Sequence, residues 1–126
     1  KRGDVRAMRL FGFAEPALIR VSNLVFEPSE LAVGDVVVFS YELEVETAEA
    51  SLLRLEYAVT FARPKSKTSR KVFHHRESEF ARGSHAIGKK HSFRDLSTRK
   101  HYAGEQEFEI IVNGVIKGRG SVRLLS

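Results

Sequence analysis

A two-residue alternation of apolar and polar side chains recurs along most of this chain and restricts what it can fold into. The alternation is clearest in residues 36–46, where Phe39, Tyr41 and Leu43 alternate with Ser40, Glu42 and other polar residues. Successive side chains of a β-strand point to opposite faces of a sheet, so this pattern indicates a strand with one buried and one solvated face. The sequence therefore predicts half-buried antiparallel strands.

Seven segments show this alternation or a weaker form of it, with turn residues between them. They are residues 17–26, 36–46, 53–63, 71–80, 86–93, 105–112 and 115–125. The last two are separated by Asn113 and Gly114, and Asn-Gly is a strong hairpin signal because both residues tolerate the positive φ of a type I′ turn. The predicted fold class is all-β, an immunoglobulin-like sandwich of two antiparallel sheets with about seven strands, and a barrel is the alternative.

Length and the start of the chain suggest how it is organised. A chain of 126 residues can bury one continuous core but not two. Apolar residues in 5–13 are spaced as on a short helix that ends at Gly12, a residue that often follows the end of a helix. We predict that residues 1–13 are the end of a preceding helical region or a linker, and that residues 14–126 form a single sandwich domain. A first residue of Lys1 rather than Met suggests a fragment of a longer protein.

Several classes of protein are excluded by composition. There is no cysteine, which excludes disulfides, thiolate zinc sites and a cysteine nucleophile. No stretch approaches 18 consecutive apolar residues and no signal-peptide pattern is present, so no membrane association is predicted. The absence of cysteine and of Asn-x-Ser/Thr sites fits a cytoplasmic protein, which is the localisation we expect.

The histidines do not form a predicted metal site. His74 and His75 are neighbours on a predicted strand, so their side chains point to opposite faces and cannot chelate one ion together. His74 could meet His85, His91 or His101 across strands, but no acidic residues with the spacing of a known site accompany them. We therefore predict no metal and no cofactor.

No catalytic constellation is recognisable either. His91, Ser92 and Asp95 are close in sequence, but a catalytic triad is defined by geometry that proximity on a loop does not provide. The segment 118–120, Gly-Arg-Gly, lacks the third glycine and the following helix of a dinucleotide site, so a β-bulge is the better interpretation. The chain is predicted not to be an enzyme by itself.

Charge is distributed unevenly along the chain. Residues 63–101 contain twelve Lys and Arg against three acidic residues, a net charge of +9, and all five histidines; the remainder is −4, which gives the total of +5. Such a segment suits a polyanion, because Lys and Arg that contact phosphates release counterions whatever the base sequence. The alternative is that these are solvated charges that protect loops and sheet edges from pairing. The candidate nucleic-acid-binding residues are Lys65, Lys67, Arg70, Lys71, Lys89, Lys90, Arg94, Arg99 and Lys100.

Three aromatic residues in or directly after the basic segment are candidates for base stacking. Phe73, Phe93 and Tyr102 could stack on bases in a groove for single-stranded nucleic acid. The interpretation we prefer is structural: Phe93 and Tyr102 would close the end of the sandwich, with the Tyr102 hydroxyl on a neighbouring backbone group as in a tyrosine corner.

A family resemblance adds to this picture. Residues 90–104, KHSFRDLSTRKHYAG, followed by residues 109–114, EIIVNG, resemble the C-terminal β-domain attached to some HEAT-repeat DNA alkylation repair proteins. Residues 70–73 and 10–13 also resemble that domain. In this family the DNA glycosylase chemistry belongs to the helical repeat domain, which holds duplex DNA on a concave basic surface. None of that domain is present here, so the resemblance supplies no catalytic residue.

Two functions follow as hypotheses. The first is a non-catalytic accessory domain of a DNA alkylation repair-like protein that contacts nucleic-acid phosphates through its basic loop region, with DNA as partner. The second is a structural or protein-interaction module that docks on the helical repeat domain of the same full-length chain or on another partner.

Overall fold

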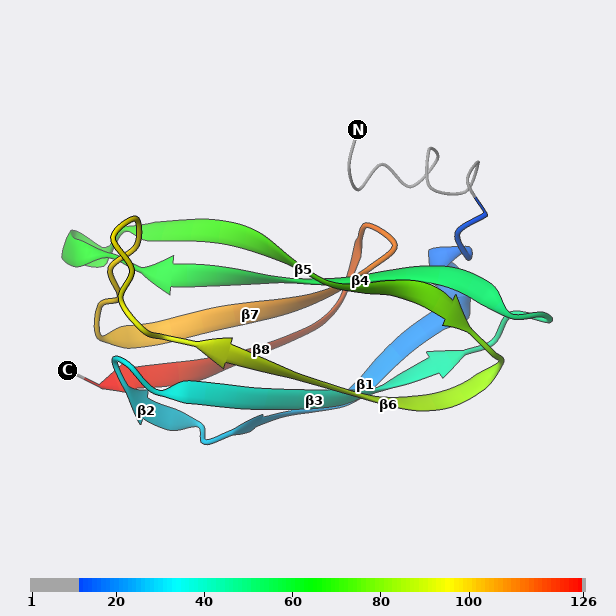
Figure 1. Ribbon diagram of the computed structural model, residues 1–126, viewed down its shortest axis with the longest axis horizontal. Coiled ribbons are helices and arrows are strands. Elements are labelled where there is room, and N and C mark those ends of the chain that lie inside the picture. Colours follow the sequence, from blue (N-terminus) through cyan, green and yellow to red (C-terminus); the bar gives the residue numbers. More distant parts are fainter. Residues whose placement is uncertain (1–11, 126) are drawn as a thin grey trace.

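Eight β-strands arranged in two sheets make up the described part of the chain, residues 12–125 of a computed structural model (Figure 1). Strands β1, β3 and β6 form a three-stranded sheet, and the other five form a sheet in the order β2-β8-β7-β4-β5. Short 3₁₀ turns precede β1 and β5. The strands are β1 (Ile19–Glu27), β2 (Glu30–Ala32), β3 (Val36–Val45), β4 (Ser51–Ala62), β5 (Thr68–Phe80), β6 (Gly83–Ser92), β7 (Gly104–Val112) and β8 (Val115–Leu125).

The predicted all-β sandwich is therefore confirmed, and each of the seven predicted strands is present. The additional strand is β2, which pairs in parallel with the end of β8, with Leu31 opposite Leu124. Three residues are too few to show an alternation, which is why the sequence did not predict it. The helical spacing predicted over residues 5–13 falls mostly on residues outside the described range; of its last two residues, Gly12 lies in a turn and Phe13 forms a bridge with Leu52.

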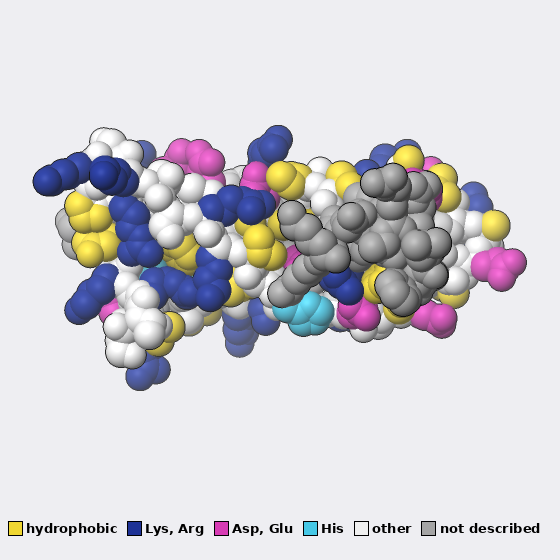
Figure 2. Space-filling view, turned by 90° about the horizontal axis from the view of Figure 1, so that it is seen from above, with side chains coloured by type: hydrophobic (Ala, Val, Ile, Leu, Met, Phe, Trp, Pro, Cys, Tyr) yellow, Lys and Arg dark blue, Asp and Glu magenta, His cyan; other side chains and the backbone are white. Residues whose placement is uncertain are grey.

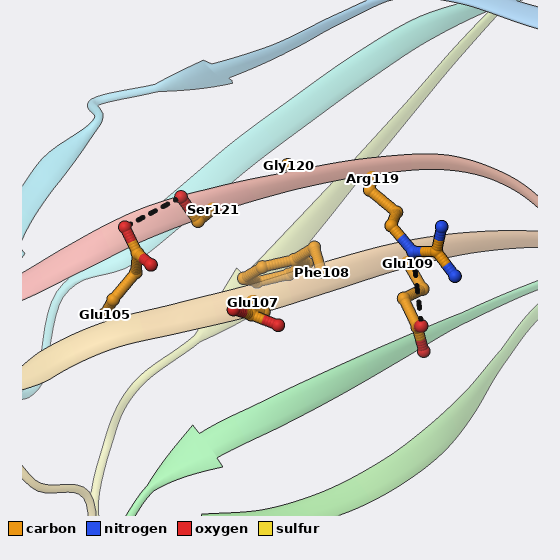
Figure 3. A pocket seen from close by; sticks show the side chains of 7 residues that line it. All are labelled: Glu105, Glu107, Phe108, Glu109, Arg119, Gly120 and Ser121. Atoms are coloured by element: carbon orange, nitrogen blue, oxygen red, sulfur yellow. Dashed lines mark hydrogen bonds and ion pairs between the residues drawn. The ribbon is translucent and has the colours of Figure 1, made fainter.

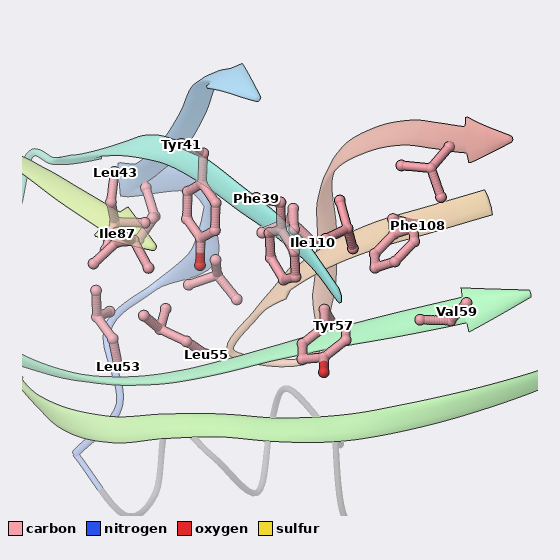
Figure 4. Packing of buried hydrophobic residues seen from close by; sticks show 14 of the residues in the cluster. Phe39, Tyr41, Leu43, Leu53, Leu55, Tyr57, Val59, Ile87, Phe108 and Ile110 are labelled. Atoms are coloured by element: carbon pink, nitrogen blue, oxygen red, sulfur yellow. The ribbon is translucent and has the colours of Figure 1, made fainter. Parts of the chain in front are cut away.

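The core lies between the two sheets and has the predicted composition. Phe39, Tyr41 and Leu43 of β3 face Leu55 and Tyr57 of β4, as Figure 4 shows. Each of these side chains is at most 4% exposed. Burial of one such side chain contributes about 1.5–3 kcal/mol, so this layer supplies much of the free energy of folding.

The predicted Asn-Gly turn between β7 and β8 also anchors the start of the domain. Asn113 and Gly114 have φ values of 48° and 84°, as a type I′ turn requires. The Asn113 side chain is buried, accepts a hydrogen bond from the Arg54 backbone N–H at 2.8 Å, and donates one to the Ala14 carbonyl at 2.9 Å. The entering chain is thereby tied to β4.

Glycines in β8 allow β1 to pack closely over it. A Cβ atom on Gly120 would lie 2.5 Å from the Phe26 ring of β1, closer than packed carbon atoms approach. The register between β7 and β8 shifts so that Lys117 is the extra residue of a bulge, which therefore lies directly before the predicted segment 118–120, whose own residues pair regularly with β7. The glycines and the bulge thus close one side of the sandwich.

Candidate nucleic-acid interface

One end of the sandwich carries a concentration of exposed cations. The β4–β5 turn and the loop of residues 93–103 lie at this end, on the left of Figure 1, and Lys and Arg side chains gather there in Figure 2. The Arg63 guanidinium joins the two segments, because it donates a hydrogen bond to the Lys100 carbonyl at 2.9 Å. We call this surface the basic end, and its members are Arg63, Lys65, Lys67, Arg94 and Lys100.

The β4–β5 connection displays its lysines through a tight turn. The Arg63 backbone N–H donates to the Lys67 carbonyl at 2.9 Å, which closes the turn around Pro64. Lys65 has a positive φ of 62°. Lys65 and Lys67 are both exposed. Because the turn is hydrogen-bonded across its base, it fixes the backbone from which the two lysine side chains extend at the end of the sandwich.

The 93–103 loop is fixed at both of its ends and in its middle. Phe93 exchanges backbone hydrogen bonds of 2.9 Å with Gly34 and Asp35. Leu96 and Arg99 form a small hairpin with backbone bonds of 2.7 and 3.2 Å. These bonds leave Arg94 and Lys100 exposed on a loop whose path is set by the protein.

A buried glutamine secures the far end of the same loop. The Gln106 side chain is 1% exposed and accepts a hydrogen bond from the Ala62 backbone N–H at 3.0 Å. Its amide nitrogen donates to the carbonyls of Tyr102 and Gly104 at 2.9 and 3.2 Å. Sequence reasoning missed Gln106. The available signal was its position on the inward face of β7, two residues before Phe108, where a polar side chain needs a buried partner.

Asp95 is the acidic residue of this loop, and it is occupied within the loop. Its carboxylate accepts the His101 backbone N–H at 2.7 Å and the His101 Nδ1–H at 3.2 Å. The backbone bond is the largest cause that lowers the pKa of Asp95. The pKa of His101 is lowered because burial outweighs the attraction of Asp95. Asp95 therefore organises the loop from within.

His91 belongs to the core rather than to a surface site. It is 6% exposed, and its Nδ1 shares a hydrogen bond of 2.9 Å with the Tyr57 hydroxyl. Its ring lies edge-on to Phe73 and Phe93, with centroids 5.1 and 5.0 Å apart. Burial is the main cause that lowers the pKa of His91 to about 4, and nearby His101 and other cations add to it. The imidazole is thus neutral near pH 7.

The nine predicted nucleic-acid-binding residues do not form one patch. Four of them, Lys65, Lys67, Arg94 and Lys100, belong to the basic end. Lys71, Lys89 and Arg99 lie along the edge formed by β5 and β6.

The remaining two point elsewhere. Arg70 is on the outer face of the five-stranded sheet and forms an ion pair with Glu109 at 2.8 Å. Lys90 lies opposite the exposed Val38, on the outer face of the other sheet.

The three aromatic candidates for base stacking also differ in where they lie and how far they are buried. Phe93 is fully buried, as the structural interpretation predicts. Phe73 stacks on Tyr57 at 5.1 Å and an interplanar angle of 16°, so one face of its ring is used within the fold. The prediction that Tyr102 closes the core is wrong, because this side chain is 38% exposed and lies beneath the Arg63 guanidinium.

An acidic hollow lies on the outer face of β7 and β8. It has a volume of about 250 Å³ and is lined by Glu105, Glu107 and Glu109 together with Arg119 and Ser121 (Figure 3). Two of the carboxylates have partners there, since Ser121 donates to Glu105 at 3.3 Å and Arg119 lies 3.7 Å from Glu109. The row of carboxylates would repel phosphates, so a polyanion is expected to avoid this face.

Residues 12–125 hold no group of three or more His, Asp or Glu side chains placed to bind a metal ion. Within the same residues, no helix has the length and apolar character needed to cross a membrane.

Comparison with known proteins places this domain in a family. A family model described as "Uncharacterised protein YhaZ, C-terminal Ig-like domain" matches residues 20–126. The chain belongs to this family. The protein YhaZ of Bacillus subtilis (strain 168) is 30% identical to it over 118 residues, which are 93% of this chain. The chain spans about a third, 32%, of the length of that relative.

Solved structures agree with the YhaZ C-terminal Ig-like fold. The alkylpurine DNA glycosylase AlkC of Pseudomonas fluorescens, bound to DNA containing an abasic site analog, has a region that matches 99% of this chain with a TM-score of 0.90 and 26% identity. The match covers 35% of the AlkC chain. A β-glucosidase of Listeria innocua matches 86% of this chain and 16% of its own, with a TM-score of 0.63 and 11% identity, a likeness of fold alone.

Proposed function

We propose that this domain is a non-catalytic accessory domain of a DNA alkylation repair protein, and that it contacts DNA phosphates through its basic end. The similarity to AlkC, whose structure contains DNA, supports the repair context. The match covers 35% of the AlkC chain, and we assign any glycosylase activity to a part of a full-length protein outside this domain.

The observation that carries this proposal is the paired display of two basic segments at one end of the sandwich. The β4–β5 turn and the 93–103 loop are both hydrogen-bonded within the protein, and Arg63 holds them together. Asp95, the acidic residue of the loop, is directed to His101. Lysine and arginine contacts to phosphate fix position without reading bases, so the expected binding has little sequence preference.

A second function is favoured by a different observation, the fixed entry of the chain. Phe13 is 8% exposed, forms a parallel bridge with Leu52, and lies 5.1 Å from the Arg54 guanidinium. Asn113 holds Ala14 in addition. A chain that enters the domain through such a joint could dock a preceding helical repeat domain in one orientation, and the domain would then be a structural module.

Fluorescence anisotropy with short duplex and single-stranded DNA separates the two functions. Four cations of the basic end are changed to Gln in one variant: Lys65, Lys67, Arg94 and Lys100. The matched control variant loses the same charge elsewhere, at Arg20, Lys117, Arg119 and Arg123.

The proposed function predicts binding that weakens with salt. About four phosphate contacts to duplex DNA correspond to a slope of about −3.6 in log K against log salt concentration. The basic-end variant should lose most of this slope and the control should keep it. If the unmodified domain does not bind DNA even at low salt, the docking module is the better account.

A further inference from the structure

Strands β5 and β6 form neighbouring edges of the two sheets on one side of the sandwich. Each is the last strand of its sheet. They approach each other closely, because the rings of Phe73 on β5 and His91 on β6 have centroids 5.1 Å apart. Side chains that point inward from these two strands therefore meet along this edge.

The strand register directs three cations inward at this edge. In an antiparallel pair, opposite residues lie on the same face of the sheet. Lys71 is opposite Val59 and Arg76 is opposite Leu55, and both partners are fully buried core residues. Lys89 is opposite Phe39, which is 1% exposed. Lys71, Arg76 and Lys89 thus extend from the inner face toward the open edge.

A fourth cation comes from the 93–103 loop. The Arg99 guanidinium lies 5.2 Å from the centroid of the Phe61 ring and 5.3 Å from that of Phe73. The Lys71 ammonium is 5.7 Å from the same Phe73 ring. We call Lys71, Arg76, Lys89 and Arg99 the edge cations.

The edge cations act on the same buried and half-buried groups. Lys89 lowers the pKa of both His75 and His91, and Arg76 also lowers that of His75. Within residues 12–125 no ion pair joins any of the edge cations to a carboxylate. Among the described residues, these four positive charges therefore share one edge and none of them has a carboxylate as an ion-pair partner.

Protection of the sheet edges explains part of this arrangement but not all of it. Inward-pointing charges do discourage a second strand from pairing with an edge. Lysine is a common residue in this protective role, so the positive sign alone does not distinguish the two roles, but protection does not require four cations that repel one another along one edge. The row also has length: Lys71 and Arg76 lie opposite Val59 and Leu55, which are four residues apart on β4, and a strand rises about 3.3 Å per residue, so they are separated by about 13 Å.

We propose that the edge cations bind a row of phosphate oxyanions, so that a nucleic-acid strand held at the basic end continues along the β5–β6 edge. The nucleic-acid source of the phosphates rests on the proposed function, whereas the phosphate chemistry of the edge does not. Arg99 connects the two surfaces, since it belongs to the loop of the basic end and lies over Phe73 of the edge.

Proton uptake is a direct consequence of such binding. His75 is surrounded by Arg76 and His74 on its own strand and by Lys89 on β6, and on β4 Glu56 lies opposite His74. Burial and these cations lower its pKa in the free protein. A phosphate at Lys89 would offset the repulsion and raise the pKa of His75 toward its ordinary value of about 6.5, so binding should strengthen as pH falls below about 6.5.

The test uses two probes, a short DNA oligonucleotide and inorganic tripolyphosphate. NMR follows the His75 imidazole of the unmodified protein during titration with each probe. A double variant, Lys71→Gln with Lys89→Gln, is compared in anisotropy with a double control of the same charge, Lys117→Gln with Arg123→Gln. Thermal unfolding verifies that both variants are folded.

The proposal predicts that His75 shifts toward its protonated form with the oligonucleotide. The double variant should reduce the salt slope by about 1.4 to 1.8, the contribution of two phosphate contacts, while the control keeps it. If only tripolyphosphate shifts His75, and the double variant abolishes that shift, the edge binds free phosphate.

Other outcomes overturn the inference. DNA binding that depends on the basic end, with His75 unmoved and the double variant equal to its control, would leave the proposed function intact and refute the edge site. A His75 that responds to neither probe would refute the edge site for both sources of phosphate.

Discussion

The His91 imidazole is buried and neutral in the folded protein, whereas water surrounds it in the unfolded chain. Its pKa is lowered from 6.5 to about 4, chiefly by burial. Between pH 6.5 and about pH 4, this residue therefore binds a proton more readily in the unfolded chain than in the folded one. The contribution of neutral His91 to the free energy of unfolding is fully present above about pH 6.5. It is lost as pH falls toward about 4, by about 3 kcal/mol.

Replacement of His91 by Gln removes the titration while it keeps a group able to bond Tyr57. We expect the free energy of unfolding of this variant to change less between pH 7 and pH 4 than that of the parent. Urea denaturation across this range measures the difference. His74→Gln, at an exposed histidine, is the control, and an H91Q profile parallel to the parent's would contradict the role given to His91.

Asn113 combines a backbone and a side-chain role in one residue. Asn113→Ala removes the partners of the Arg54 N–H and the Ala14 carbonyl, at a cost of about 1–3 kcal/mol for each group left buried and unpaired. Alanine also tolerates the φ of 48° poorly. We expect a clear decrease in the urea midpoint. Asn113→Gly, which tolerates this φ, should recover only the backbone part, and a full recovery would show that the hydrogen bonds contribute little.

Strands β1 and β8 pack closely against each other at Gly120, and the stability of the fold depends on this contact. A methyl group there would overlap the Phe26 ring, so Gly120→Ala should lower the free energy of unfolding by about 1–3 kcal/mol. Gly118→Ala is the milder comparison, because its nearest contact would be 3.3 Å from Val21. Thermal unfolding measures both.

A smaller side chain at position 26, where the Phe26 ring packs over Gly120, provides the decisive control. If overlap with Phe26 is the cause, Phe26→Leu should make the G120A substitution less costly in the double variant. Equal costs in both backgrounds would assign the effect to the glycine backbone instead.

At the level of elements, the sequence predicted what local pattern determines. Alternation identified β3 and β7 because one face of each is buried, and Asn113-Gly114 identified the hairpin because its φ values demand those residue types. The path of the 93–103 loop was not predictable, since Gln106 and Asp35 hold it from other elements. Such bonds depend on spatial neighbours that no local pattern encodes.

For the whole molecule, the sequence shows which residues are Lys or Arg but does not predict which face, edge or end of the sandwich each side chain points to. Arg70 and Lys71 are neighbours in sequence, yet one points outward to Glu109 and the other inward beside Phe73. A bulge near His75 then changes the register for the rest of β5. The basic segment is thereby divided between the basic end, the β5–β6 edge and the outer faces.

This division allows a prediction that separates a binding surface from a structural one. The cations at the basic end repel each other, and salt screens exposed charges, so the parent should gain thermal stability as salt rises from low to physiological concentration. The variant with Lys65, Lys67, Arg94 and Lys100 changed to Gln should be as stable as the parent or more so at low salt, by up to about 1 kcal/mol, and less sensitive to salt.

Exposed residues that bind a ligand commonly reduce stability, because their geometry serves the ligand rather than the fold. Calorimetry of the parent, the basic-end variant and the equal-charge control at two salt concentrations measures this directly. A basic-end variant that is less stable than both others would show that these cations support the loop itself. The same cations would then be structural, and the case for a phosphate-binding end would rest on DNA titration alone.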